Sequence, residues 1–128
     1  MAKLGAKAGW NGNYCESVVA DYSVTSSDSG KVFILSGAVR TVTLPALSSS
    51  LAGFNCTIIS DGAFDHVITG GNSLIYGSGL MDGDKTQFYT AKSTLTLTSG
   101  SIGDSFSIKS DGTKWYCLNQ AQSGVTSA

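Results

Sequence analysis

The sequence predicts an all-β fold, an antiparallel β-sandwich or small barrel of about nine or ten short strands with an extended N-terminal arm. Gly supplies 16 of the 128 residues and only 13% are charged, a composition that disfavours helices and suits tight turns. Short alternating stretches recur at spacings of about 8 to 12 residues, with turn residues between them. Residues 103–118 have the pattern of a complete β-hairpin.

This hairpin is the clearest structural element in the chain. Phe106 and Ile108 alternate with polar residues, which is the two-residue period of a half-buried strand. Asp111 and Gly112 supply the turn, because Gly accepts positive φ and Asp bonds to its own backbone. The return strand carries large side chains on alternating sides, Trp115 and Cys117 on one and Tyr116 and Leu118 on the other. Large side chains on both faces predict a strand that is covered on both sides.

Residues 1–13 fit neither the helix nor the strand pattern, and we expect an arm that precedes a single β-rich domain at residues 14–128. The arm consists mostly of small residues around Lys3, Lys7 and Trp10, and no apolar face forms at either period. Trp10 either folds back on its own domain or anchors the arm in a pocket of a partner. Fully extended, the arm spans roughly 40 Å, several times the half-width of the domain.

After the arm, short strands alternate with turns. Pro45 ends the fourth of these strands, because proline cannot donate a hydrogen bond to a strand ladder. Residues 45–53 are the one stretch in which a short helical turn is predicted. The strands expected in this half of the chain lie at residues 15–19, 21–25, 31–35, 40–44 and 54–59.

The second half alternates less regularly, apart from residues 93–98, whose period of two is unbroken. Residues 76–85 are rich in glycine and predict a loop. Residues 119–128 are small and polar, and we expect a tail that is mobile at its end. The remaining strands are expected at residues 67–69, 74–76 and 86–90. The absence of βαβ alternation favours mainly antiparallel pairs.

No residue pattern supports an enzyme, a metal site or a cofactor. His66 is the only histidine, and its neighbours are typical of a loop that enters a strand rather than of a catalytic centre. Asp61 and Asp65 are more typical of solvated turn positions than of an acid–base pair. Residues 82–84, Asp-Gly-Asp, have two carboxylates spaced as in a calcium loop but lack the remaining ligands, so a plain turn is favoured.

The three cysteines, Cys15, Cys56 and Cys117, are far apart and form none of the close pairs typical of metal sites. Their odd number, in a chain without an export signal, favours reduced thiols that act as small buried apolar groups. An inter-subunit disulfide and a single internal bridge are the alternatives.

The net charge of -1 and the eight Lys and Arg residues argue against a nucleic-acid-binding face, which needs clustered cations. No apolar run is long enough to span a bilayer, and the first residues lack the apolar stretch of a secretory signal. We therefore expect neither a nucleic acid nor a membrane as partner, and synthesis in a cytoplasm.

Three stretches of the chain resemble small β-rich structural proteins of tailed bacteriophages. They are ADYSVTSSDSGKVFIL at residues 20–35, VTLPAL at 42–47 and GDSFSIKSDGTKWY at 103–116. The closest group in this resemblance is the capsid decoration, or cement, proteins on the outside of the phage head. The similarity spans about residues 20–118 and leaves out the arm, and similar segments also occur in phage tail and fibre modules.

The resemblance implies a non-catalytic virion protein, made in the bacterial host cytoplasm. Such a protein binds the major capsid protein on the outer surface of an icosahedral head and stabilises the head, often as a homotrimer. The arm would then lie across a seam between capsid subunits. Trp10 and Tyr14 would anchor it, with Lys3 and Lys7 against acidic capsid surface.

The alternative is a receptor- or carbohydrate-binding module of a tail fibre. This alternative predicts exposed aromatic side chains on one sheet face or loop end, and Trp10, Tyr76 and Tyr89 are the candidates for stacking on sugars. A core or interface position is the more ordinary role of such residues. A minor virion enzyme, the third interpretation, would need a pocket that gathers His66 or the aspartate pairs.

Overall fold

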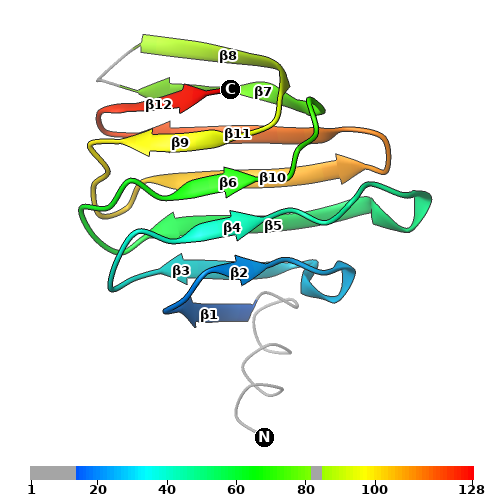
Figure 1. The fold of residues 1–128 in the computed structure, drawn as a ribbon, viewed down its shortest axis with the longest axis horizontal. Coiled ribbons are helices and arrows are strands. Elements are labelled where there is room, and N and C mark those ends of the chain that lie inside the picture. Colours follow the sequence, from blue (N-terminus) through cyan, green and yellow to red (C-terminus); the bar gives the residue numbers. More distant parts are fainter. Residues whose placement is uncertain (1–13, 82–84) are drawn as a thin grey trace, which may run out of the picture.

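Two β-sheets packed face to face form the protein, and the all-β prediction is confirmed (Figure 1). The computed structural model describes residues 14–81 and 85–128. Of the two predicted architectures, the described strands form the sandwich, because neither sheet closes into a barrel. These strands number twelve, more than expected.

The larger sheet has seven strands in the order β1-β3-β5-β10-β11-β7-β8. Its edge strands, β1 and β8, lie at the bottom and the top of Figure 1. The bounds are β1 (Tyr14–Val18), β3 (Lys31–Leu35), β5 (Ala52–Ser60), β7 (Ile75–Met81), β8 (Lys85–Lys92), β10 (Ser105–Asp111) and β11 (Trp115–Ala121).

The smaller sheet has five strands in the order β12-β9-β6-β4-β2. Their bounds are β2 (Tyr22–Ser23), β4 (Thr41–Thr43), β6 (Val67–Thr69), β9 (Leu95–Thr98) and β12 (Gly124–Ser127). Two single 3-10 turns, η1 (Ser26–Asp28) and η2 (Ser49–Leu51), lie between strands, and η2 confirms the helical turn predicted within residues 45–53. No helix in the described part of the chain is long and apolar enough to cross a membrane.

The first seven strands alternate between the two sheets as the chain proceeds. Each connection crosses from one layer to the other, so successive strands of one sheet run in the same direction. Four pairings in this part, β1–β3, β3–β5, β2–β4 and β4–β6, are therefore parallel, and so is β11–β7. The other five pairings of the described strands are antiparallel, so both sheets are mixed rather than mainly antiparallel. A period of two shows which face a residue occupies but not which strand lies beside it.

The predicted hairpin is confirmed as β10 and β11, which pair antiparallel. At its turn, Oδ1 of Asp111 accepts hydrogen bonds from the backbone N–H groups of Thr113 and Lys114, each at 2.8 Å. Gly112 has a φ of 91°, the left-handed conformation that the turn requires. Strand β10 also pairs with β5, so the hairpin lies within the larger sheet rather than at its edge.

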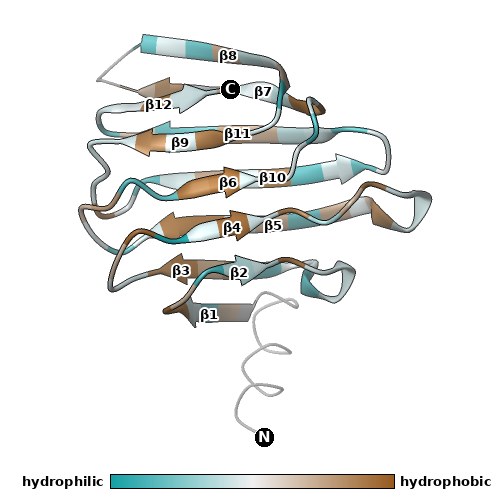
Figure 2. Cartoon of the chain, in the orientation of Figure 1, coloured by the Kyte–Doolittle hydropathy of each residue, from teal (hydrophilic) through white to brown (hydrophobic). Residues whose placement is uncertain are grey.

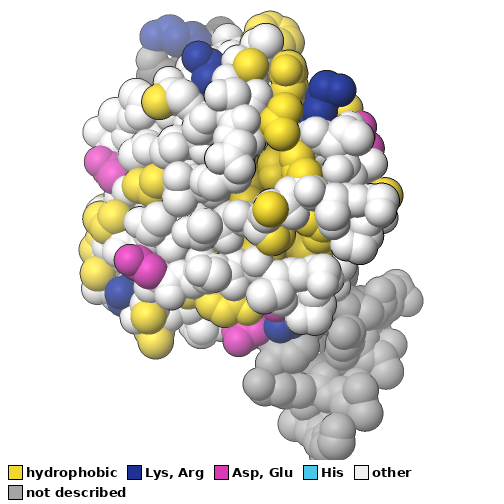
Figure 3. Space-filling view, turned by 45° about the vertical axis from the view of Figure 1, so that its right-hand side comes forward, with side chains coloured by type: hydrophobic (Ala, Val, Ile, Leu, Met, Phe, Trp, Pro, Cys, Tyr) yellow, Lys and Arg dark blue, Asp and Glu magenta, His cyan; other side chains and the backbone are white. Residues whose placement is uncertain are grey.

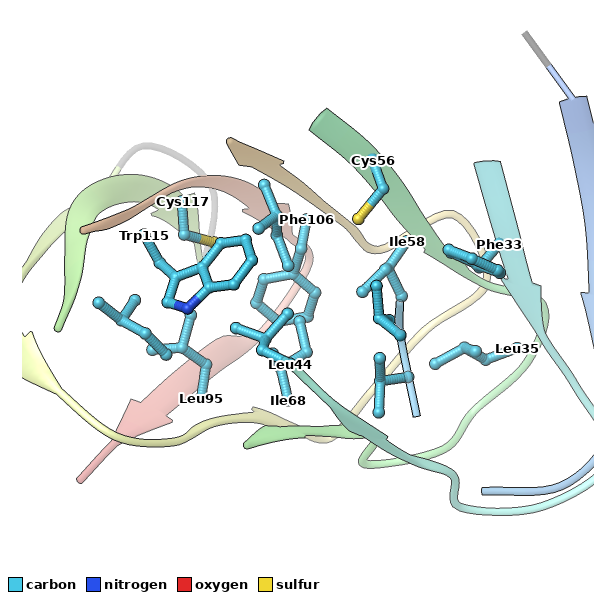
Figure 4. Packing of buried hydrophobic residues seen from close by; sticks show 14 of the residues in the cluster. Phe33, Leu35, Leu44, Cys56, Ile58, Ile68, Leu95, Phe106, Trp115 and Cys117 are labelled. Atoms are coloured by element: carbon cyan, nitrogen blue, oxygen red, sulfur yellow. The ribbon is translucent and has the colours of Figure 1, made fainter. Parts of the chain in front are cut away.

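Side chains from both sheets meet in one continuous hydrophobic cluster (Figure 4). Hydrophobic residues are prominent on β3, β4, β5, β6 and β9, whereas β8 is mostly hydrophilic (Figure 2). The rings of Trp115 and Phe54 pack edge to face, 5.7 Å apart at 88°. Burying a large apolar side chain contributes about 1.5–3 kcal/mol, so this cluster is the main stabilising feature of the sandwich.

Strand β7 occupies most of the segment that was predicted to be a glycine-rich loop. A Cβ on Gly77, whose φ is 146°, would lie 1.8 Å from the carbonyl oxygen of Cys117 on β11. A Cβ on Gly79 would lie 1.9 Å from Oδ1 of Asn119. The glycines therefore allow β7 to lie close against β11, which is the role of glycine inside a strand.

The C-terminal residues belong to the sandwich, and the prediction of a mobile tail is wrong. Asn119 lies on β11 with its side chain buried, and Val125 of β12 is buried against β9. The backbone oxygen of Ala128 accepts hydrogen bonds from the N–H groups of Ser93 and Thr94, at 2.6 Å and 3.0 Å. Small polar residues thus pair through their backbones here, which composition alone does not reveal.

Candidate interaction surface

The two outer faces of the sandwich carry different side chains. On the smaller sheet, the residues that alternate with the buried ones are mostly threonines: Thr41, Thr43, Thr69, Thr96, Thr98 and Thr126. None of the large exposed hydrophobic residues in the described ranges lies on these strands. This face therefore has the composition of an ordinary solvated sheet face.

The outer face of the larger sheet is different, because it carries large apolar side chains that are exposed to solvent. Leu118 is 58% exposed, Phe88 74%, Leu80 45% and Tyr116 42%. The prediction that the return strand of the hairpin is covered on both sides is therefore wrong within one chain. The second sheet covers Trp115 and Cys117 on the inner face only.

Cross-strand register places the outward residues of this sheet in three rows, which together we call the open face. The first row is Ser17, Ile34, Ile59, Ser105, Gln120, Leu80 and Thr86. The second row is Cys15, Val32, Thr57, Ser107, Leu118, Ser78 and Phe88. The third row is Asn55, Lys109, Tyr116 and Tyr76.

The open face has two apolar ridges with a polar trough between them. Leu80, Phe88 and Leu118 form what we call the β8-side ridge, and Val32, Ile34 and Ile59 form the β3-side ridge. The trough over β5 and β10 consists of Thr57, Ser105 and Ser107. A hollow of about 370 Å³ lies over the trough and the β8-side ridge. A second hollow, of about 340 Å³, shares Leu80 and reaches Ile102, which is also exposed.

Charge is nearly absent from the open face. Lys109 is the one charged side chain in its three rows. Asp111 lies two residues further along β10, where it accepts a hydrogen bond from the Tyr116 hydroxyl at 3.0 Å. The N–H groups of Thr113 and Lys114 hold the pKa of Asp111 well below its usual range, so this carboxylate is ionised at any ordinary pH.

Figure 3 shows a band of hydrophobic side chains along one side of the molecule, with Lys, Arg, Asp and Glu side chains around it. Interfaces between proteins are depleted of charge at their centre and enriched in aromatic residues. The open face fits that description better than the threonine face does. We therefore take the open face as the candidate interaction surface.

Of the four residues predicted to hold the arm on a partner, the structure describes one, Tyr14. Lys3, Lys7 and Trp10 lie outside the described residues, and Tyr14 is the first residue of β1, paired in register with Lys31. Of the two candidate sugar platforms that are described, Tyr89 is buried and Tyr76 is half-buried on the open face. Sequence analysis missed Leu80 and Phe88, because glycines around Leu80 suggested a loop.

His66 is buried at the start of β6 and does not line any of the hollows described above. Its Nδ1 accepts a hydrogen bond from the backbone N–H of Arg40 at 2.9 Å, so the neutral ring carries its hydrogen on Nε2. Nε2 has no hydrogen-bond partner among the described residues. Burial, together with the nearby Arg40 charge, lowers the pKa of His66. This histidine is a neutral, inward-facing group that links β6 to the segment before β4.

The aspartates singled out in the sequence are separate turn residues where the structure describes them. Asp65 accepts the N–H of Gly100 at 2.8 Å and so joins two loops, and Asp61 is exposed. Residues 82–84, the possible calcium turn, lie outside the described part of the chain. Within that part, no group of three or more His, Cys, Asp or Glu side chains is arranged to hold a metal ion.

The three cysteines are unbonded and fall into two classes. Cys56 and Cys117 are buried on β5 and β11, and burial raises the pKa of each thiol to about 12. They are the small apolar core groups that the sequence predicted. Cys15 differs from the prediction, since it is exposed on the edge strand β1, at the end of the second row of the open face.

Comparison with protein-family models finds no match for this chain, and no curated protein sequence is significantly similar to it.

Proposed function

We propose that this protein is a structural virion component that binds the outside of an icosahedral phage head and stabilises it. The observation that carries the proposal is the resemblance of residues 20–118 to capsid decoration proteins. In this chain these residues belong to a β-sandwich, the kind of fold expected of such a module. A sandwich whose titratable histidine is buried and whose aspartates support turns is suited to adhesion rather than to a reaction. In this proposal the protein acts without catalysis, metal or cofactor.

Head stabilisation follows from selective binding. A protein that binds the closed shell but not its separated subunits stabilises the shell by about 2.7 kcal/mol per site when its free concentration is 100 times Kd. Many equivalent sites on one shell multiply this contribution. A stiff sandwich serves the purpose because little conformational entropy is lost from the module itself on binding.

The arm, residues 1–13, is the segment that we propose contacts the shell. It precedes β1, the edge strand of the larger sheet, so the chain enters the sandwich at one end of the molecule. Lys3 and Lys7 would contact acidic capsid surface, while Trp10 and Tyr14 would fill apolar sites. The open face is then left for other contacts.

Deletion of residues 1–13 tests this assignment. We expect the truncated protein to keep its thermal unfolding transition and to lose most of its occupancy on purified heads. The double variant Lys3→Glu and Lys7→Glu should lose occupancy mainly at low ionic strength, since exposed charge pairs are screened by salt. Full occupancy of the truncated protein would remove the arm from the proposal. Imaging particles with and without the protein then shows where it lies.

One observation favours the alternative, a receptor- or carbohydrate-binding module of a tail fibre. Tyr116 and Tyr76 are direct neighbours on the open face, and Asn55 and Lys109 continue the same row. Aromatic faces beside amide and amine donors are a common way to hold a sugar ring. Copy number separates the two functions, because a decoration protein is present in hundreds of copies per particle and a fibre module in a few. Glycan binding by the purified protein would favour the fibre module.

A further inference from the structure

We propose that the open face binds a second copy of this chain, with the β8-side ridge of one copy packed against the β3-side ridge and trough of the other. The proposal does not rest on the capsid function, because association of the purified chain needs no other partner. Four features of the face point to this occupant: its size, its charge, its shape and the contrast with the threonine face.

The open face is large enough for a stable interface. Seven strands spaced about 4.8 Å apart, with two full rows of outward side chains and a third row over four strands, about 6.8 Å between rows, cover at most roughly 34 Å by 20 Å. A flat projection of that size is close to the 800 Å² or so that each partner contributes to a standard protein interface. A second copy brings a face of the same extent, so the two match in area.

The charge on the face suits self-association. Lys109 and the nearby Asp111 are of opposite sign, so a copy placed on the face adds no net like charge. Hydrogen bonds from the Tyr116 hydroxyl and the turn N–H groups orient the carboxylate of Asp111. This carboxylate can accept a further hydrogen bond from Lys109 of the partner copy. A strongly acidic or basic partner would meet no surface of complementary charge on the open face.

The relief of the face is complementary to itself. The β8-side ridge projects, with Leu118 and Phe88 both more than half exposed, whereas the residues of the β3-side ridge are half-buried. The hollow of about 370 Å³ is lined by Thr57, Ser105 and Ser107 of the trough and also by Leu80 and Leu118 of the β8-side ridge, so this recess lies directly beside the projecting side chains. A projecting ridge and a recess on the same face allow each copy to fill the recess of another. Such a contact closes either as a two-fold pair or as a small ring.

The threonine face provides the contrast within the same molecule. Both outer faces are built on the same alternation, yet large apolar side chains appear on only one of them among the described residues. Exposed apolar groups that are contiguous on a soluble protein usually mark a contact site. The residue pattern of β11, with large groups on both sides, is the pattern of a strand covered on both sides. A second copy supplies the missing cover.

The test is the mass of the purified full-length chain in solution, measured by analytical ultracentrifugation as a function of concentration. We expect a mass of two or more chains at tens of micromolar. Leu118→Lys places a charge in the centre of the face and should weaken association by at least about 30-fold, the loss expected at a central interface residue. Thr43→Lys, at an exposed position on the threonine face, should leave the mass unchanged. Equal thermal unfolding of the separated variants shows that both remain folded.

A wild-type protein that stays monomeric up to about 100 μM overturns the proposal, since that concentration corresponds to a Kd weaker than specific interfaces of this size show. Oligomers that survive Leu118→Lys unchanged also overturn it, because the copies must then meet through another surface. If a monomeric wild type binds heads or glycans and Leu118→Lys abolishes that binding, the open face belongs to that partner instead. The capsid function is judged separately, from head occupancy, so the two proposals fail independently.

Discussion

The Nζ of Lys31 donates a hydrogen bond to Oδ1 of Asp28 at 2.8 Å, which ties the start of β3 to the 3-10 turn before it. The other oxygen of the same buried carboxylate accepts the N–H of Thr25 and the hydroxyl of Tyr22, each at 2.9 Å. Lys31 also lies 3.3 Å from Glu16 on the edge strand β1. Asp28 therefore connects elements of both sheets at the end where the arm enters the sandwich.

Asp28→Asn should lower the free energy of unfolding by about 2 kcal/mol, because it replaces a buried carboxylate that accepts hydrogen bonds from Lys31, Thr25 and Tyr22. Urea denaturation monitored by Trp fluorescence measures the change. Asp61→Asn, at an exposed turn, should change stability by no more than about 0.5 kcal/mol. Equal losses in the two variants would contradict a special role for the buried carboxylate.

Stability should fall as the pH drops below about 6.5, the ordinary pKa of histidine. Burial and the Arg40 charge lower the pKa of His66 in the folded protein. Between the folded and unfolded pKa values, the unfolded chain therefore binds a proton at this residue and the folded chain does not. The contribution of His66 is complete above the unfolded pKa and is lost progressively as the pH falls toward the folded pKa. Denaturation midpoints between pH 8 and 5 measure this slope.

His66→Asn is the matched control for this pH dependence. The Asn oxygen can accept the Arg40 N–H in place of Nδ1, but the side chain does not titrate in this range. The variant should be somewhat less stable at pH 8 and should lack most of the slope between pH 7 and 5. An undiminished slope would assign it to other groups.

Tyr89→Phe should cost about 2 kcal/mol, because the Tyr89 hydroxyl donates to Oδ1 of the buried Asn119 and its loss leaves a buried polar group without its partner. Tyr116→Phe removes a hydroxyl of the same kind at an exposed site, where Asp111 keeps its backbone donors, and should cost less than about 1 kcal/mol. Thermal unfolding of both variants provides the comparison. A larger loss of stability in Tyr116→Phe than in Tyr89→Phe would contradict this ranking, because the hairpin turn would then contribute more than the Tyr89–Asn119 hydrogen bond between β8 and β11.

Gly77→Ala should prevent β7 from pairing with β11, since the added methyl would lie 1.8 Å from the Cys117 carbonyl at a φ of 146°. We expect at least about 3 kcal/mol of destabilisation or failure to fold, as for other changes that force a backbone shift. Gly124→Ala meets no atom closer than 4.0 Å and should be tolerated. Soluble, cooperatively unfolding Gly77→Ala protein with wild-type stability would contradict the close approach of the two strands.

Local alternation and turn chemistry were enough to predict most strand positions, the hairpin at β10 and β11 and the helical turn before β5. They also predicted which residues of the hairpin share a face, because a period of two and a well-formed Asp-Gly turn depend only on near neighbours in the chain. Segments in which glycine serves close packing, such as β7, were mistaken for loops. Glycine has the same appearance in sequence whether it relieves a turn or makes room for a neighbouring strand.

The sequence by itself determined that this chain forms short amphipathic strands and that its charge is low. Only the tertiary structure decided that consecutive strands in the first half of the chain alternate between the two layers, so that neighbouring strands of one sheet pair in parallel. It also decided that Leu118 and Tyr116 lie on a face which the second sheet does not cover. The physical reason is that a strand's own residues fix its two faces. Its neighbours and its cover are fixed by hydrogen bonds and packing between residues far apart in the chain.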